Sequence, residues 1–221
     1  MLRLSKKLAL TWLAVAIVTT ASATAQVTAP QRKTSTPYTG DLSIFETEGR
    51  AERLHINHVM DALAISPGKN VADIGAGSGW FTVRAASRVT TTGKVYAVDV
   101  NPEAIRYIDR RVAKDGIPNV TAILSKPDNP MLPVNSVDAV LLLKTYHEVA
   151  NPIQLMRNLE PALRPEARIG IIDRNGNGEN HGVAKTAVVQ EMGQAGYRLI
   201  GEQDDLVKDD NVDYFLVFVA K

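Results

Sequence analysis

Short apolar runs alternate with amphipathic stretches along most of the chain, and this alternation predicts a β-sheet flanked by helices. Seven runs are predicted as strands, at residues 71–74, 94–100, 120–124, 137–143, 168–172, 197–201 and 213–220. The fourth run is apolar on both faces, which is typical of a central parallel strand. The last run is too apolar for an exposed edge of a sheet.

The stretches between the strands predict helices. A first helix is expected at 50–65, where apolar side chains recur at the helical spacing i, i+3, i+4 and i+7, namely at Ile56, Val59, Met60 and Leu63. Asn101-Pro102 and Asn151-Pro152 each place a capping residue before a proline that suits a first helical turn. A further helix is expected from about residue 183 to residue 196.

The order of these elements predicts the fold class. Strands that alternate with helices form a parallel sheet with helices on both sides. The last two strands have no helix between them, so at least one of them must be antiparallel to its neighbour. We therefore expect an α/β fold: a doubly wound, Rossmann-like, seven-stranded sheet that is mostly parallel, with an antiparallel last strand.

Residues 1–25 have the layout of a secretory signal peptide. Arg3, Lys6 and Lys7 give a positive start, residues 8–18 are mostly apolar, and residues 21–25 offer small side chains for cleavage. The apolar run is shorter than the roughly 20 residues of a membrane span; an uncleaved anchor and a misplaced start codon are the alternatives. We expect a periplasmic or secreted protein with no stable membrane span after cleavage, a flexible lead-in at 26–42 and one domain at 43–221.

Composition narrows the possible partners. Removing residues 1–25 takes away three positive charges and no negative ones, so the formal net charge changes from +1 to −2. This balance argues against a nucleic-acid partner. The sequence has no cysteine, which excludes disulfides, thiolate metal sites and a cysteine nucleophile. Its four histidines contain no i, i+4 pair, and no metal site is predicted.

The most informative stretch is the turn after the first strand, Val-Ala-Asp-Ile-Gly-Ala-Gly-Ser-Gly at 71–79. Residues without a Cβ let backbone N–H groups come close to a ligand. Asp99 lies at the end of the second predicted strand. In doubly wound folds, an acidic residue at about this distance after the glycine turn binds the ribose diol. The turn alone suits a nucleotide, a dinucleotide or a structural role. The dinucleotide fingerprint Gly-x-Gly-x-x-Gly needs a glycine where this chain has Trp80.

An acidic residue, one spacer and Gly-x-Gly-x-Gly form the first motif of the class I S-adenosylmethionine (SAM)-dependent methyltransferases. Asp73, Gly75, Gly77 and Gly79 fill this motif, and the chain resembles the family from about Arg50 to its end. The resemblance implies that SAM is the cofactor. It also implies that the seventh strand inserts beside the fifth and that the N-terminal segment packs across the mouth of the cofactor pocket.

The same resemblance implies cofactor contacts for eight residues, namely Asp73, Gly75, Ala76, Gly77, Gly79, Asp99, Val100 and Asp128. The turn would contact the methionine part of SAM through backbone groups, and its aspartate would hold the turn or reach the ammonium group. Asp99 would accept hydrogen bonds from the ribose, and Val100 would lie against the adenine. Asp128 would accept from the adenine amino group; an ordinary turn aspartate is the alternative.

Tyr146, His147 and Glu148 follow the fourth strand, where a methyl acceptor would lie. Histidine titrates near neutral pH, a partly buried glutamate can act as a base, and a tyrosine can orient the acceptor or contact the sulfonium. The alternative is an ordinary loop or helix start. The polar loop at 173–181 would close over an acceptor or serve as a connector.

One departure from the family lies before the fifth strand, where Pro165-Glu166-Ala167 replaces the usual Pro-Gly-Gly and predicts a turn of different shape. Together the patterns predict an exported SAM-dependent methyltransferase with a small-molecule acceptor. A SAM- or nucleoside-binding protein without turnover is the alternative, and an NAD-linked oxidoreductase is the weaker third. The acceptor and the oligomeric state stay open.

Overall fold

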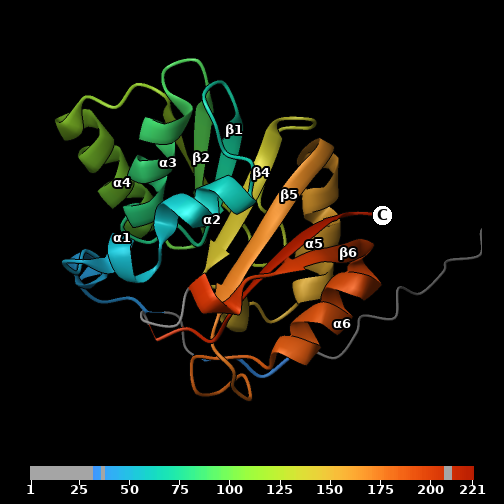
Figure 1. Cartoon of the computed structure of the whole chain (residues 1–221). Coiled ribbons are helices and arrows are strands. Elements are labelled where there is room, and N and C mark those ends of the chain that lie inside the picture. Colours follow the sequence, from blue (N-terminus) through green and yellow to red (C-terminus); the bar gives the residue numbers. More distant parts are fainter. Residues whose placement is uncertain (1–31, 36–37, 207–210) are drawn as a thin grey trace, which may run out of the picture.

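The computed structural model describes residues 32–35, 38–206 and 211–221, which form a seven-stranded sheet with helices on both faces (Figure 1). The strands are β1 (Asn70–Ile74), β2 (Lys94–Asp99), β3 (Val120–Leu124), β4 (Val137–Leu143), β5 (Leu163–Asp173), β6 (Tyr197–Glu202) and β7 (Tyr214–Ala220). Their order in the sheet is β3-β2-β1-β4-β5-β7-β6. The first five strands are parallel, whereas β7 is antiparallel to β5 and β6. The predicted fold class and the insertion of the seventh strand beside the fifth are confirmed.

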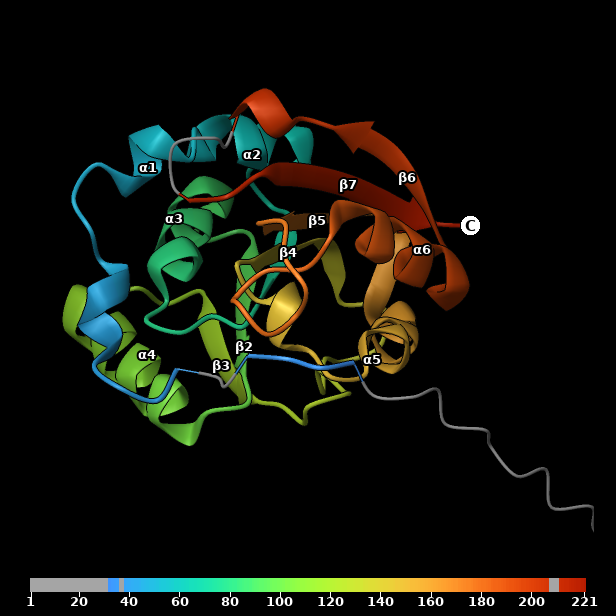
Figure 2. The ribbon, with the colours of Figure 1, turned by 90° about the horizontal axis from the view of Figure 1, so that it is seen from below.

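Two helical layers cover the sheet. The helices are α1 (Arg50–Arg53), α2 (Ile56–Ala62), α3 (Trp80–Val89), α4 (Pro102–Asp115), α5 (Pro152–Leu159) and α6 (Lys185–Ala195). α2, α3 and α4 lie on one face, and α5 and α6 on the other (Figures 1 and 2). Successive residues of β4 alternate between the layers: Leu141 packs in the cluster of α2 and α3, and Leu142 in the cluster of α5 and α6. No helix within the described ranges is long and apolar enough to cross a membrane.

The helix expected at 50–65 is interrupted. α1 ends at Arg53, and α2 begins at Ile56. Between them, His55 has a left-handed backbone with φ of 45°. The predicted apolar stripe is buried nonetheless, because it lies almost wholly within α2.

The departure at Pro165-Glu166-Ala167 lies within β5, which starts earlier than expected. Val137 pairs with Leu163 and Ala139 with Arg168, so the intervening residues of β5 bulge out of the ladder. Glu166 has φ of 63°. A non-glycine residue thus adopts a positive φ here, and the expected difference in shape from the family's turn stays a prediction.

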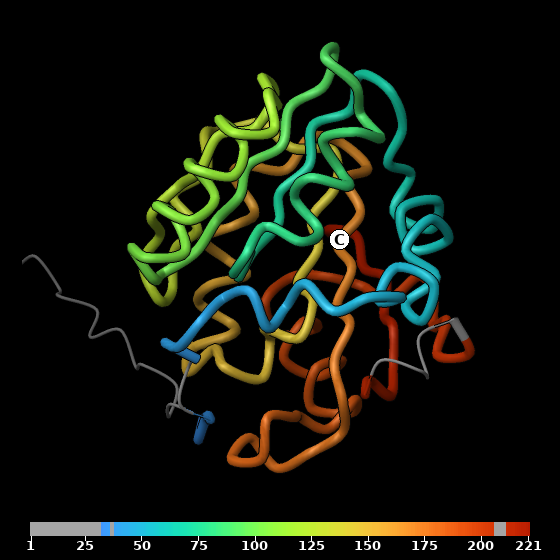
Figure 3. The backbone as a smooth tube through the Cα atoms, turned by 90° about the vertical axis from the view of Figure 1, so that its left-hand side faces the viewer, coloured from blue at the N-terminus to red at the C-terminus, as the bar shows by residue number. Residues whose placement is uncertain are grey.

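The N-terminal lead-in packs against the domain where the structure describes it. Arg32 donates to the carbonyl oxygen of Val149 at 3.0 Å and to Glu191 at 2.8 Å, and Ser35 is buried. A 3-10 helix, η1 (Leu42–Phe45), follows, and Figure 3 shows this light-blue segment crossing the molecule. Residues 32–35 and 38–42 thus contact the domain, and the flexibility expected of the lead-in stays a prediction. The predicted signal peptide lies outside the described residues.

Candidate active site

A cavity of about 1060 Å³ lies at the C-terminal ends of the central strands. Its walls come from the glycine turn after β1, the ends of β2 and β4, and the loops after β3 and β5. The N-terminal segment closes one side with Tyr38, Leu42 and Phe45. This is the position at which open α/β sheets bind ligands, where the strand order reverses.

The glycine turn has a backbone that other residues rarely adopt. Gly75, Gly77 and Gly79 have φ of 76°, 54° and 76°. A Cβ on Gly75 would lie 2.3 Å from the side chain of Thr145, so the turn packs directly against the segment after β4. Gly79 caps α3 and approaches Ile108 of α4; it does not line the cavity. Gly79 therefore has a packing role between two helices, and its contact with the cofactor stays a prediction.

Asp99 connects the end of β2 to the glycine turn. Its carboxylate accepts from the backbone N–H of Gly77 and of Asn101, both at 2.8 Å. Burial raises the pKa of Asp99, and these backbone hydrogen bonds oppose the rise. A carboxylate has about four lone-pair positions, so two bonds leave capacity for a hydroxyl pair. Val100 follows, with 47% of its surface exposed, and lines the cavity.

Asp73 lies in the cavity wall below the turn and is buried. Thr82 of α3 donates its hydroxyl to the carboxylate at 2.6 Å. Burial raises the pKa of Asp73 to about 7, although the hydrogen bond from Thr82 favours the charged form. Asp73 therefore ties the end of β1 to α3 and places a titratable carboxyl group in the cavity wall.

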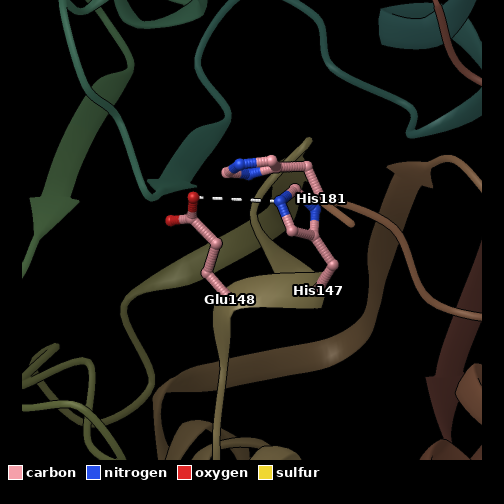
Figure 4. A group of neighbouring side chains, drawn as sticks. All are labelled: His147, Glu148 and His181. Carbon is pink, nitrogen blue, oxygen red and sulfur yellow. Dashed lines mark ion pairs between the residues drawn. The ribbon is translucent and has the colours of Figure 1, made fainter. Parts of the chain in front are cut away.

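The opposite end of the cavity is polar and is built on η2 (Tyr146–Glu148), a 3-10 turn after β4. Asp173 at the end of β5 accepts from the backbone N–H of His147 at 3.0 Å, and its Oδ1 lies 2.8 Å from Nδ1 of the same histidine. The other ring nitrogen, Nε2, faces Glu148 at 3.8 Å (Figure 4). Burial raises the pKa of Glu148 to about 7. His181, from the loop after β5, lies edge-to-face with His147 at 5.8 Å.

Comparison with known proteins agrees with this geometry. Residues 65–213 match the family model described as a methyltransferase domain. The chain belongs to this methyltransferase family. A solved SAM-dependent methyltransferase from Aquifex aeolicus is 26% identical, with a TM-score of 0.70 over 82% of this chain and 98% of that one.

Two curated relatives show the extent of the sequence match. A protein-L-isoaspartate O-methyltransferase of Pyrococcus horikoshii is 31% identical over 108 residues, which are 48% of this chain and 47% of that protein. An uncharacterized methyltransferase of Mycobacterium bovis is 31% identical over 150 residues, or 68% of this chain and 54% of that protein. The chain spans about half the length of these relatives. The family identifies the cofactor of this methyltransferase as SAM.

Two predicted site residues of the methyltransferase are not among the residues that line the cavity. Tyr146 is fully buried under η2, with the guanidinium of Arg32 5.2 Å from its ring centre, and it does not line the cavity. Asp128 sits in a tight turn closed by hydrogen bonds between Lys126 and Asn129; its neighbours Pro127 and Pro130 line the cavity, and Asp128 does not. The contacts predicted for these two residues stay predictions, because side-chain direction depends on the local turn as well as on sequence position.

Two residues at the polar end of the cavity, Asp173 and His181, had no individual role predicted from the sequence. Asp173 and His181 belong to the loop that was expected to cover an acceptor, yet neither was expected to contact His147. The contact between Asp173 and His147 could have been predicted from the order of the strands. Asp173 ends β5, and β5 lies next to β4, which is followed by η2. The parallel pairing of these strands brings their C-terminal ends together.

The described N-terminal segment fastens the cavity wall of the methyltransferase. Ser78 of the glycine turn donates to Glu46 at 2.6 Å, and Arg111 of α4 donates to the same carboxylate. Trp80 lies between the guanidinium groups of Arg50 and Arg84, at 4.4 Å and 4.0 Å from its ring centre. These contacts agree with the expectation that the N-terminal segment packs across the mouth of the pocket.

Proposed function

We propose that this methyltransferase is exported and transfers a methyl group to a small molecule bound between SAM and the side chains of His147 and Glu148. The observation that carries the proposal is one cavity that reaches from the glycine turn to these two side chains. Its volume of about 1060 Å³ is at the upper end of the range for small-molecule pockets. It therefore has room for a cofactor and a second ligand.

The cavity is suited to SAM on its own geometry. Gly75 and Gly77 have no side chains to keep the methionine part away from the turn, and Asp99 keeps lone pairs for ribose hydroxyls. The carboxyl group of Asp73 lies where it can balance an ammonium group. When bound, SAM supplies an electrophilic methyl group on a sulfonium centre. The protein contributes mainly the alignment of the acceptor with that group.

The walls indicate what kind of acceptor fits. Tyr38, Leu42 and Phe45 form an apolar side, whereas His147 and Glu148 form a polar end. An acceptor with a flat apolar body and one polar nucleophile would match both. The closure of one side by residues 38–47 favours a small molecule over a macromolecule. After removal of residues 1–25 the net charge is −2, so the protein as a whole does not attract the negatively charged backbone of a nucleic acid.

Export rests on residues 1–25 alone. Their charge pattern and cleavage sites support a periplasmic or secreted location. The same feature favours a second candidate, a SAM- or nucleoside-binding protein without turnover, because SAM is made in the cytoplasm. Detection of methyl transfer separates the two candidates.

The test combines calorimetry and a transfer assay on the purified protein. SAM and S-adenosylhomocysteine should bind, and NAD should not. Labelled SAM incubated with small-molecule extracts should then give a labelled product. His147→Gln should leave SAM affinity within about twofold and slow transfer by roughly 10²–10⁴-fold, whereas His58→Gln on the exposed side of α2 should change neither. SAM binding without any labelled product would support the binding protein.

A further inference from the structure

Three side chains of types that bind metals converge at the polar end of the cavity. His147 and Glu148 come from η2, and His181 comes from the loop after β5 (Figure 4). One ligand atom from each residue lies within 4.8 Å of the other two. Sequence spacing could not reveal this group, because 34 positions of chain and an entire strand separate the two histidines.

The hydrogen bonds of His147 determine which ring nitrogen is available. Asp173 is fully buried, and its carboxylate also accepts from the backbone N–H groups of His147 and Arg174. The nearby Nδ1 of His147 therefore donates its proton to Asp173. In the neutral ring, Nε2 then carries the lone pair and faces Glu148. A carboxylate behind a histidine is the usual outer-shell arrangement of a metal-ligating imidazole.

His181 is held in place through its backbone. Its N–H donates to the hydroxyl of Ser35 at 2.7 Å, and Ser35 donates to the carbonyl oxygen of Gly178 at 3.2 Å. Ser35 is 5% exposed, so this contact is sheltered from water. The N-terminal segment thus fixes the loop that carries the third side chain.

We propose that His147, Glu148 and His181 bind one divalent first-row transition-metal ion at the acceptor end of the cavity. Ligand atoms that share an ion at about 2.1 Å lie about 3.0–3.4 Å apart, so rotation of the Glu148 and His181 side chains would close the present spacing. Two imidazoles and one carboxylate favour an ion such as Zn²⁺, Co²⁺ or Fe²⁺ over Mg²⁺ or Ca²⁺. The three residues leave coordination positions open toward the cavity.

The role of this ion in methyl transfer rests on the proposed function. A hydroxyl group of the acceptor that coordinates the ion would become more acidic and lose its proton to water, which leaves an oxygen nucleophile held beside the cofactor. The ion keeps its oxidation state, and no additional reactant is needed. The substrate class is accordingly a hydroxyl-bearing small molecule whose oxygen can bind a metal.

The experiment measures metal binding without SAM or acceptor. Protein treated with a chelator is titrated with Zn²⁺ by calorimetry and with Co²⁺ by visible absorption. We expect one ion per chain and a Co²⁺ spectrum with ligand-field bands. His181→Ala and Glu148→Gln should each weaken Zn²⁺ binding at least tenfold, and Asp173→Asn should weaken it by about 10–100-fold through the outer shell.

The chain offers a matched control in His55 and His58, an exposed stacked pair away from the cavity. His55→Ala/His58→Ala should leave the Co²⁺ spectrum and Zn²⁺ affinity unchanged. The proposal would be overturned if the unmodified protein did not bind Zn²⁺ or Co²⁺. It would also be overturned if both His181→Ala and Glu148→Gln kept full Zn²⁺ affinity, or if the control variant lost binding. SAM titration of every variant reports separately on folding and on the cofactor site. Failure of SAM binding or of methyl transfer would contradict the proposed function while the metal measurement still stands.

Discussion

Asp99→Ala tests the cofactor end of the cavity, and its effect divides into two parts. The native carboxylate accepts from the N–H groups of Gly77 and Asn101. Hydrogen bonds to a charged group contribute about 1.5–3 kcal/mol each, but cavity water can replace the carboxylate at Gly77. We therefore expect a loss of about 1–3 kcal/mol in the free energy of unfolding. For a chain of this size, each kcal/mol corresponds to a decrease in Tm of about 2–4 °C.

The second part is binding. Removal of one or two charge-assisted bonds to the ribose should weaken SAM affinity roughly ten- to hundredfold. Calorimetry at a temperature where both proteins are folded measures this loss separately from Tm. Asp109→Ala, on the exposed side of α4, is the matched control and should change neither quantity. An unchanged Kd for SAM in folded Asp99→Ala protein would refute the assignment of Asp99 to the cofactor.

Three other predictions concern the backbone, pH and the N-terminus. Glu166→Gly should raise Tm, since a left-handed non-glycine residue costs about 1–2 kcal/mol, and calorimetric unfolding measures the gain. The pKa of Asp73 in the folded protein, about 7, lies above its value in the unfolded chain. Between about pH 4 and 7 the folded state therefore binds more protons than the unfolded state. The free energy of unfolding should fall as the pH rises through that window. Asp73→Asn should flatten that slope in denaturant titrations across the window. Mass spectrometry of the native protein should find an N-terminus near Thr24 or Gln26 outside the cytoplasm; an intact Met1 in the cytoplasm would contradict export.

The layered fold was predictable because its signals are local. The strands alternate with amphipathic stretches, and Asn101 caps α4 as expected, accepting from the backbone N–H of Glu103 at 2.9 Å. The place of β7 followed from the family resemblance and not from the hydrophobic pattern. The backbone conformations of His55 and Glu166 were not predictable, because both are ordinary residues in the left-handed region, which non-glycine residues rarely adopt.

The acceptor end shows where sequence reasoning stops. Three consecutive residues were assigned to it, but a 3-10 turn sends successive side chains in directions about 120° apart. Tyr146 therefore enters the core, while His147 and Glu148 face the cavity. Which residue points which way is decided by the bond from the backbone of His147 to Asp173, a contact between strands that local pattern does not encode.

The segment that follows the predicted cleavage site contributes to the acceptor end. Arg32 donates to the backbone carbonyl oxygens of Tyr146 and Val149, on either side of the cavity-facing residues of η2. Ser35 binds the backbone of His181. Residues 32–35 thus contact both the η2 turn and the loop that carries His181, whereas Glu46, further along the N-terminal segment, binds Ser78 of the glycine turn. Cleavage near residue 25 retains this segment, so export and an intact acceptor end are compatible in one chain.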